Sequence, residues 1–348
     1  MTPDGARPEI AVIIGAYRRS EFLARAVQSV LAQTLPRSAF EVLVVTDRPD
    51  PDLQRALERS GIRVRTDAEP RIGRWLADAV ADTSAPLIAF LDDDDEFEPD
   101  RLQAAVGVFR AHPEVVFYRN RVRVIDRSGS PVPESRWSSL TLDPTYDRTG
   151  TRLVPTSDAA AVLELFESGA TLSFNSSSMI VRRDLVVGET RAAFEPTQLP
   201  DLALAVLAAL APGAIYLDAG RRTRFRETAG SATRNYRWLR VSAESHERLA
   251  EYTLGRGAPA LAAWLGERSV HFDRMFRGES VVEGVRSASS RREVARGALD
   301  YLRFLGRHPR EWSTALNVWA APLYAGGYVV APSLARRLAV ARPTAGIG

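Results

Sequence analysis

The chain has 348 residues, with 46 basic against 43 acidic side chains, so its formal net charge is only +3. Hydrophobic residues make up 45% and charged residues 26%, a mixture typical of globular proteins that excludes a largely disordered chain. Cysteine is absent, which excludes disulfides, zinc–thiolate sites, iron–sulfur clusters and thiol nucleophiles. All 46 cations are arginine, which also excludes a lysine Schiff base and a P-loop lysine.

Strand and helix patterns alternate through the first 120 residues. Short apolar runs rich in β-branched residues indicate buried strands, and apolar residues at helical spacing lie between them. The strands are predicted at 10–14, 41–45, 62–65, 87–91 and 115–118, and the helices at 22–31, 53–59, 72–81 and from Pro99 to 109. This order predicts an α/β fold, a mostly parallel sheet with helices on both faces.

The pattern changes after residue 120. The sequence predicts a hairpin from residues 121–125 and 131–132, an irregular loop over 134–156, helices at 158–167 and 202–210, and strands at 179–181 and 215–217. Only helical patterns remain from about residue 236, so we expect a helical appendage over 236–348.

Three predicted strands end in glycine or polar residues, at the sheet edge where open α/β folds bind ligands. These ends are Gly15-Ala16-Tyr17-Arg18-Arg19, Thr46-Asp47 and four consecutive aspartates at 92–95. The G-x-G-x-x-G turn of dinucleotide-binding domains is not present after the first strand, where only Gly15 stands, and this disfavours a dinucleotide.

The four aspartates allow two interpretations. Adjacent carboxylates repel one another, and holding them at the end of a buried strand is costly without a cation. Oxygen ligands suit Mg²⁺ or Mn²⁺, which commonly bridge protein carboxylates and substrate phosphates. Alternatively, the run is a solvated acidic turn before the helix predicted at Pro99, whose N-terminus favours negative charge. The run alone does not decide between the two.

Four further residues fit a nucleotide site, each with a structural alternative. Tyr17 either stacks on a base or packs on the first helix. Asp47 either accepts hydrogen bonds from a base or ribose, or forms a turn. Arg71 and Arg74 flank Gly73 and either clamp a diphosphate or lie solvated on the surface.

The region beyond residue 200 adds one acid and a basic stretch. Asp201 either caps the helix predicted at 202–210 or serves as a general base. Residues 221–240 hold seven arginines and one acid, Glu227, and either face an anionic ligand or form a solvated face.

Taken together, these positions resemble the family 2 glycosyltransferases of the GT-A fold, over about residues 8–235. The resemblance rests on Gly15–Arg19 with Gln28–Thr34, on Val44–Asp47, on Ile88–Asp95 with Glu98–Leu102 (similar to the family's D-x-D-D…P-D-x-L metal motif), on Asn175–Arg183 and on Phe225–Ser231. Thr228 stands where the family has a metal-binding histidine, next to Glu227.

The resemblance implies roles for the candidate residues. Nucleotide-sugar binding would involve Gly15, Ala16, Tyr17, Arg19, Asp47, Arg71, Arg74, Asp92 and Asp93. Asp94 would bind the metal, Mn²⁺ or Mg²⁺, and Asp201 would be the catalytic base. Residues 1–120 would form the nucleotide-sugar half of the GT-A domain, 121–235 its acceptor half, and 236–348 the helical C-terminal region.

The implied reaction moves a sugar from a nucleoside-diphosphate donor, with UDP as the default, to a hydroxyl with inversion. The acceptor would be a carbohydrate, a lipid-linked or a small-molecule hydroxyl. Two other classes stay open: a nucleotidyltransferase acting on a sugar phosphate, which would use the same aspartates and release pyrophosphate, and a non-catalytic sugar-nucleotide or membrane-surface binding protein.

The sequence also bears on location. Residues 1–9 lack the pattern of a signal peptide, and no uninterrupted run of about 20 apolar residues appears, so we expect a cytoplasmic protein. The C-terminal region has arginines beside apolar stretches, at 303, 307, 310, 336 and 337. Its helices are either ordinary amphipathic surface or core helices or make peripheral contact with the inner face of a membrane. The near-balanced charge does not indicate nucleic-acid binding.

Overall fold

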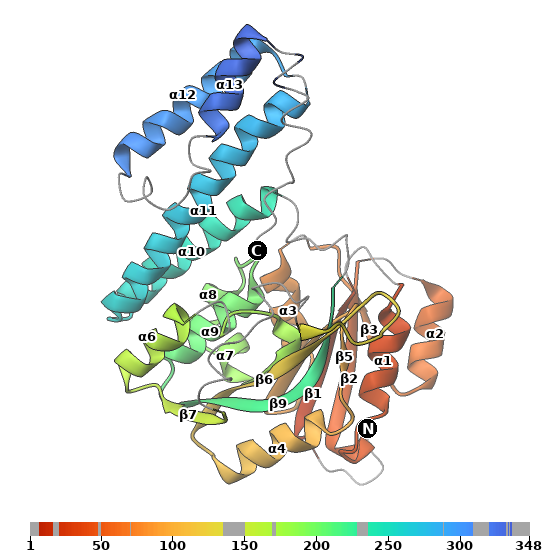
Figure 1. Ribbon diagram of the computed structural model, residues 1–348. Coiled ribbons are helices and arrows are strands. Elements are labelled where there is room, and N and C mark those ends of the chain that lie inside the picture. The colour runs from red at the N-terminus through yellow and green to blue at the C-terminus, as the bar shows by residue number, and fades with distance from the viewer. Residues whose placement is uncertain are drawn as a thin grey trace. The chain divides into compact units, whose positions relative to one another are not determined.

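The computed structural model describes residues 7–16, 21–47, 50–69, 71–134, 150–168, 172–227, 236–287, 289–308, 320–331, 333 and 335 (Figure 1). The strands are β1 (Ile10–Ala16), β2 (Phe40–Thr46), β3 (Arg63–Thr66), β4 (Leu87–Asp92), β5 (Glu96–Phe97), β6 (Val115–Ile125), β7 (Arg152–Pro155), β8 (Met179–Arg182) and β9 (Ala214–Arg226). The helices are α1 (Leu23–Leu31), α2 (Pro51–Arg59), α3 (Ile72–Ala81), α4 (Arg101–Ala111), α6 (Ala159–Glu167), α7 (Asp184–Val187), α8 (Arg191–Phe194), α9 (Pro200–Leu210), α10 (Arg237–Gly255), α11 (Pro259–Arg286), α12 (Arg291–Arg307) and α13 (Ala320–Val330).

The chain divides into two compact units. The first comprises Met1–Thr228 with Gly255–Ala258, and the second Ala229–Leu254 with Pro259–Gly348. The first unit holds the sheet and the second only helices among its described elements, as the sequence predicts.

The first unit is built on one mixed sheet in the order β3-β2-β1-β4-β8-β6-β9-β5, with β7 paired to β9. Strands β3, β2, β1 and β4 run parallel, and β8 turns antiparallel to both β4 and β6. Strand β1 is buried because it lies between two partners and under helices on both faces, which is why its sequence is an unbroken apolar run. The α/β prediction is confirmed.

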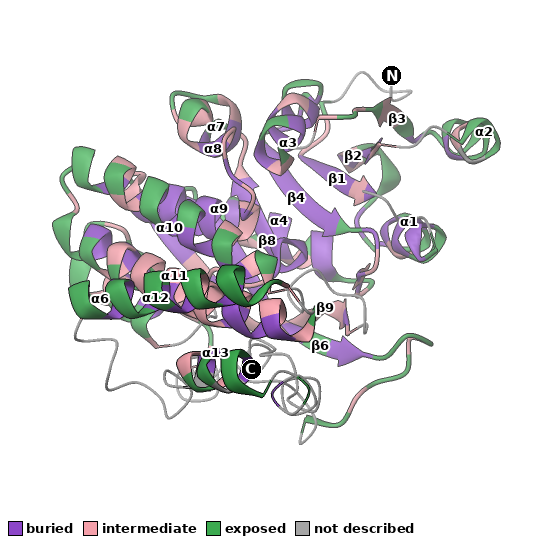
Figure 2. Cartoon of the chain, turned by 90° about the horizontal axis from the view of Figure 1, so that it is seen from above, coloured by how far each residue is buried: buried purple, intermediate pink, exposed green. Residues whose placement is uncertain are grey.

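The central strands β1 and β4 are buried (Figure 2), and their alternating residues face the two sides of the sheet. Ile10, Val12 and Ile14 of β1 pack with the apolar sides of α1 and α4 in one core cluster. Gly15, of opposite parity, faces Trp75 of α3 on the other side. Buried α9 contacts β6 and β8. Both faces are therefore covered, as a parallel sheet requires.

Four sequence predictions need correction. Strand β9 runs over 13 residues, Ala214–Arg226, where only 215–217 were predicted. Within the predicted loop 134–156, Arg152–Pro155 forms β7, and 135–149 lie outside the described residues. Pro99 was predicted to open a helix, but it occupies the second position of a turn that Arg101 N–H closes by donating to Glu98 C=O. Helix α4 therefore begins at Arg101.

The fourth correction concerns the predicted hairpin. The hairpin is present, since Asp126 N–H donates to Ser130 C=O, Val132 N–H donates to Val124 C=O and Ile125 bridges Pro131 in antiparallel fashion. Its first arm is not a separate strand, however, because residues 121–125 continue β6 and pair in parallel with β9. The longer ladder satisfies backbone groups that a two-strand hairpin would leave to solvent.

The second unit has its own apolar core. Residues from α11, α12 and α13, among them Val282, Tyr301 and Tyr328, pack together in this core. Helix α12 begins with a complete capping box, in which Ser290 and Glu293 exchange hydrogen bonds with each other's backbone. In the described part of the chain, no helix combines the length and apolarity that a bilayer crossing needs.

Two glycines in helices give opposite predictions for stability. A Cβ on Gly73 would overlap Phe194 C=O and stand 3.0 Å from Glu195 C=O, so we expect Gly73→Ala to destabilise the protein by about 1–3 kcal/mol. On Gly107 of α4 no described atom lies within 4 Å of such a Cβ, and Gly107→Ala should stabilise by about 0.5–1 kcal/mol. Urea unfolding of both variants tests this; shifts in the same direction would contradict it.

Candidate functional site

The carboxyl ends of β1, β2 and β4 meet at one edge of the sheet. The register pairs Gly15 with Val45 on one side and with Asp92 on the other, and Ala16 pairs with Thr46. Asp47 follows directly and is half-buried. Gly15, Ala16, Asp47 and the aspartate run, predicted from separate sequence segments, thus lie at the same sheet edge.

Gly15 is required by close packing rather than by an unusual backbone angle. A Cβ here would stand 2.7 Å from the indole of Trp75, which packs against the end of β1. The Gly15 carbonyl accepts a hydrogen bond of 3.1 Å from Asp93 N–H, which ties the aspartate turn to β1. This hydrogen bond fixes the position of the aspartate turn relative to the end of β1.

The aspartate run folds into a turn that brings three of its four carboxylates together and directs the fourth elsewhere. Asp95 N–H donates to Asp92 C=O at 3.1 Å, which closes the turn. One carboxylate oxygen each of Asp92, Asp94 and Asp95 lies within 4.8 Å of the others. Asp93, buried with 4% exposure, is not part of this group, which we call the acidic group (Asp92, Asp94 and Asp95).

Burial and mutual repulsion act on the acidic group. The Asp92 side chain reaches solvent, but surrounding protein displaces part of its hydration; this desolvation, followed by the charges of Asp94, Asp93 and Asp201, raises its pKa to about 7. Burial, followed by repulsion from Asp94 and Asp92, also holds the pKa of Asp95 well above its usual range. A cation would relieve both effects, and an all-oxygen site suits a hard divalent ion.

The segment Asn175–Ser178 packs against the acidic group. Ser176 Oγ donates to Asp92 at 3.3 Å, and Asp92 N–H donates to Ser177 Oγ at 3.0 Å. Asn175 Nδ2 donates to Asp95 Oδ2 at 2.7 Å. Neutral donors therefore hold the carboxylates in place without cancelling their charge.

Asp201 lies beside this segment. It stands in the first turn of α9 after Pro200, and its two oxygens accept from Asn175 N–H at 3.3 Å and Leu202 N–H at 2.9 Å. The N-cap position of α9 is Leu199, so Asp201 is not the N-cap residue, although its carboxylate accepts a backbone N–H of the first turn as a capping side chain does. Desolvation raises its pKa to about 6, against these hydrogen bonds and the charge of Arg119.

Arg226 is a site residue that sequence reasoning missed. Its side chain is fully buried; Nε donates to Asp94 C=O at 2.8 Å, and its backbone N–H donates to Asp95 Oδ1 at 2.9 Å. Its guanidinium also pairs with Glu96. Arg226 thereby ties the aspartate turn to the end of β9.

The other described arginines of β9 are engaged with acids. Arg224 forms a two-pronged pair with Glu98 at 2.9 and 3.0 Å, and Arg222 bonds Asp218 at 2.8 Å and also pairs with Asp100. The basic stretch seen in the sequence is thus, over Arg222–Arg226, an internal ion-pair ladder rather than a patch directed at a ligand.

Arg71 and Arg74 lie exposed at the start of α3. Arg71 forms a two-pronged pair with Glu69 at 2.8 and 2.9 Å, and Arg74 lies 3.8 Å from the same carboxylate. The hydrogen bonds from Arg71 lower the pKa of Glu69 to about 2. A diphosphate would have to compete with Glu69 for both guanidinium groups. Tyr17, Arg19 and Thr228 lie outside the described residues.

Comparison with known proteins agrees with this site. Residues 11–167 match the family model described as Glycosyl transferase family 2. Over these residues the chain is similar to family 2 glycosyltransferases. It is 29% identical over 133 residues to the uncharacterized glycosyltransferase alr2836 of Nostoc sp., a match that covers 36% of this chain and 40% of that protein. The chain therefore spans less than half of that curated relative.

Solved structures share the fold of this chain. The crystal structure of S. aureus TarS 1-349 in complex with UDP-GlcNAc superposes with a TM-score of 0.56 at 17% identity, covering 95% of this chain and 90% of that one. The longer S. aureus TarS structure gives 0.51 at 16% identity and covers 95% of this chain and 54% of that one. At these identities the likeness establishes the fold, and it confirms the predicted GT-A type.

Sequence reasoning reached only part of this site. It singled out the aspartate run and Asp201 but left Asp95 and Arg226 out. The family match ends at residue 167, before Asn175 and Asp201, so these two are placed by tertiary structure. The sequence offered Asn175 as the first residue of Asn175–Arg183, a stretch whose resemblance to the family implies that it lines the acceptor side, but gave this residue no role of its own.

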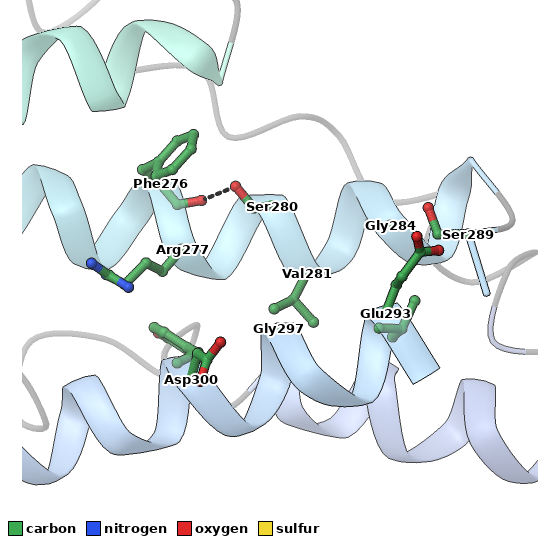
Figure 3. A pocket seen from close by; sticks show the side chains of 11 residues that line it. Phe276, Arg277, Ser280, Val281, Gly284, Ser289, Glu293, Gly297 and Asp300 are labelled. Atoms are coloured by element: carbon green, nitrogen blue, oxygen red, sulfur yellow. Dashed lines mark hydrogen bonds between the residues drawn. The ribbon is translucent and has the colours of Figure 1, made fainter. Parts of the chain in front are cut away.

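A pocket of about 320 Å³ lies in the second unit between α11 and α12 (Figure 3). Gly284 and Gly297 are among its lining residues, and a Cβ on either would contact a valine of the facing helix, Val294 at 3.4 Å or Val281 at 3.5 Å. Charged groups at its rim already have partners: Arg277 Nε donates to Asp273 at 2.9 Å, and Glu293 belongs to the capping box. We assign this pocket no role in the reaction.

The cost of holding the acidic group without a cation predicts a stabilising substitution. The raised pKa of Asp95 means that the native state favours its protonated form, so stability is lost as pH rises from the unfolded pKa of about 3.9. At pH 8 we expect Asp95→Asn to stabilise the metal-free protein by on the order of 1 kcal/mol and to abolish stabilisation by Mn²⁺.

Thermal unfolding with and without Mn²⁺ measures both effects. Asp52→Asn, on the exposed side of α2, is the control with the same charge change. An Asp95→Asn protein that melts no higher than the control variant, or that still responds to Mn²⁺, would contradict the prediction.

Proposed function

We propose that the protein is an inverting glycosyltransferase that moves a sugar from a nucleoside-diphosphate sugar to a hydroxyl. The observation that carries this proposal is the placement of Asp201 beside the acidic group, within one hydrogen-bonded cluster. An acidic group suited to a divalent ion and a single carboxylate with a raised pKa are the two parts that such a transfer needs. The family 2 match supports the same class.

The donor is proposed to lie across the ends of β1, β2 and β4. Gly15, Ala16, Asp47, Asp92 and Asp93 line this edge or follow it, and Arg71 and Arg74 stand at the start of α3. Tyr17 and Arg19, which continue from Ala16, belong to the same proposed subsite. We take UDP as the nucleotide, because the fold is shared with TarS, whose structure contains UDP-GlcNAc.

The acidic group fits a divalent ion. It offers oxygen atoms alone, and carboxylates this close to one another are stabilised by positive charge. Asp92, Asp94 and Asp95 would hold Mn²⁺ or Mg²⁺, which when bound neutralises charge on the leaving diphosphate. The sequence assigned this role to Asp94 alone, and we add Asp92 and Asp95 because their carboxylates lie close to that of Asp94.

Asp201 is proposed as the general base. With a pKa of about 6 it is ionised at neutral pH and still basic enough to accept a proton from an acceptor hydroxyl. The proton passes to the carboxylate as the hydroxyl oxygen bonds the anomeric carbon, and the bond to the diphosphate breaks on the opposite side. Attack from that side inverts the anomeric centre.

The predicted division of labour stays a proposal. Residues 1–120 would bind the donor, 121–235 would complete the GT-A domain on the acceptor side, and 236–348 would form the helical region. The acceptor is proposed to be a carbohydrate, a lipid-linked or a small-molecule hydroxyl.

The test is transfer assayed across a panel of nucleotide sugars with Mn²⁺, with the released nucleotide identified. We expect nucleoside diphosphate; pyrophosphate from a nucleoside triphosphate and a sugar phosphate would instead establish a nucleotidyltransferase.

We expect Asp94→Ala to be inactive and Asp201→Asn to lose about 10²–10⁴-fold in kcat. The kcat of the native protein should fall as the pH drops below about 6, because Asp201 is then protonated and cannot act as a base.

The controls are Asp52→Asn for the acidic group and Asp184→Asn for Asp201. Asp184 is also an acid in the first turn of a helix, α7, but it is exposed. Native-like kcat in Asp94→Ala or in Asp201→Asn would remove that residue from the mechanism. Donor binding without turnover of any donor would favour a non-catalytic binding protein.

We propose in addition that α12 contacts an anionic membrane surface. Its exposed residues include five arginines against two acids, and Leu299 and Leu302 are 48% and 40% exposed among them. The arginines are Arg291, Arg292, Arg296, Arg303 and Arg307. Arg292, Arg296, Leu299 and Arg303 follow helical spacing along one side. Basic residues near an anionic bilayer contribute about 1 kcal/mol each, and the leucines add apolar contact.

Vesicle sedimentation tests this second proposal. We expect the protein to bind phosphatidylglycerol vesicles and not phosphatidylcholine vesicles, and Arg292→Glu with Arg296→Glu to abolish binding because both charges are reversed. The matched control reverses Arg55 and Arg59, which are exposed on α2. Equal loss in both double variants, or no binding by the native protein, would refute a role of α12.

A further inference from the structure

Asn175 joins the acidic group to Asp201. Its side-chain Nδ2 donates to Asp95 Oδ2 at 2.7 Å, and its backbone N–H donates to Asp201 Oδ2 at 3.3 Å. These carboxylates belong to distant elements, one at the end of β4 and the other at the start of α9. A single residue thus touches a proposed metal ligand and the proposed base.

The backbone conformation of Asn175 directs its side-chain amide toward Asp95 and its backbone N–H toward Asp201. Its φ is +63°, and among described residues it is the one non-glycine residue with positive φ. Such a conformation is disfavoured for most side chains and persists where neighbours impose it. Here the Asn175 carbonyl accepts from Ser178 N–H at 3.0 Å and from Ser178 Oγ at 2.8 Å, which holds the residue in place.

The amide oxygen of Asn175 is a second, independent observation. The residue is 6% exposed, and its Oδ1 is buried without a hydrogen-bond partner. The orientation of the amide is fixed by the bond from Nδ2 to Asp95. Buried carbonyl oxygens are nearly always paired, so an unpaired one beside a carboxylate cluster indicates a hydrogen donor or cation that arrives with the substrates.

We propose that Asn175 is a positioning residue that sets the geometry of Asp201 relative to the acidic group. This inference rests on the proposed function, since it assigns Asn175 a purpose within that site. The side chain orients Asp95 for the ion, and the backbone N–H orients the oxygen of Asp201 that accepts the proton. Displacement of a reacting group by about 1 Å costs on the order of 10²-fold in rate, so such a tether matters to catalysis.

Two substitutions separate the halves of this role. Asn175→Gly keeps the positive φ and the backbone N–H to Asp201 but removes the amide that holds Asp95. We expect it to bind Mn²⁺ about 10-fold more weakly, with kcat at saturating Mn²⁺ near the native value. Asn175→Ala also disfavours the positive φ, so kcat at saturating Mn²⁺ and donor should fall by about 10²-fold with little change in donor KM.

Mn²⁺ binding is measured by the electron paramagnetic resonance signal of the free ion, which does not depend on turnover. Thr83→Ala is the control, because Thr83 is also buried, its Oγ1 donates to the backbone carbonyl of Val80 at 2.7 Å, and it precedes β4 at the end opposite the acidic group. Thermal unfolding checks that each variant is folded, and Asn175→Gly stands in if Asn175→Ala is not. Asn175 variants that match Thr83→Ala in Mn²⁺ affinity and in kcat would overturn the proposal.

The outcomes separate this inference from the proposed function. If the native protein transfers no sugar, the proposed function fails, and Mn²⁺ affinity of Asn175→Gly still decides whether Asn175 orients the acidic group. If the native protein is active and Asn175→Ala retains its full kcat, the function stands and the positioning role fails.

Discussion

The site depends on like charges held together at the end of β4. Three carboxylates meet there because the turn over Asp92–Asp95 is closed by its own backbone and tied to β1 through Gly15 C=O and to β9 through Arg226. The resulting repulsion and burial raise the pKa of Asp92 and Asp95. Holding these carboxylates together lowers the stability of the folded protein, as is common at sites that bind a charged ligand.

The neighbours of the acidic group hold it without neutralising it. Asn175, Ser176 and the backbone N–H of Arg226 contribute neutral donors. The buried guanidinium of Arg226 is directed to Glu96 and to carbonyl oxygens instead of the carboxylates of the group. Farther along, Arg224 and Arg222 pair with acids of their own. The attraction for a cation is therefore preserved within a rigid frame.

A second theme is the use of buried polar residues to join distant elements. Arg101 is fully buried and bonds Asn120, Thr223 and Met179 C=O, while Thr223 Oγ1 donates to Ser177 C=O. This network fastens α4, β6, β8 and β9 below the segment Asn175–Ser178. Burial lowers the pKa of Arg101 to about 9 and raises that of Asp201, so the polar interior is costly and must be well ordered.

The sequence by itself determined the strands β1, β2 and β4, the helix α3 and the placement of an aspartate run at the sheet edge, because buried parallel strands are continuous apolar runs bounded by polar ends. It did not show the length of β9, whose arginines look solvated until their acidic partners are known. Only tertiary structure decided that Asp95, and not Asp93, joins Asp92 and Asp94, and that Asn175 meets Asp201. The direction of a side chain around a turn, and contacts between residues far apart in the chain, depend on long-range packing that no local pattern carries.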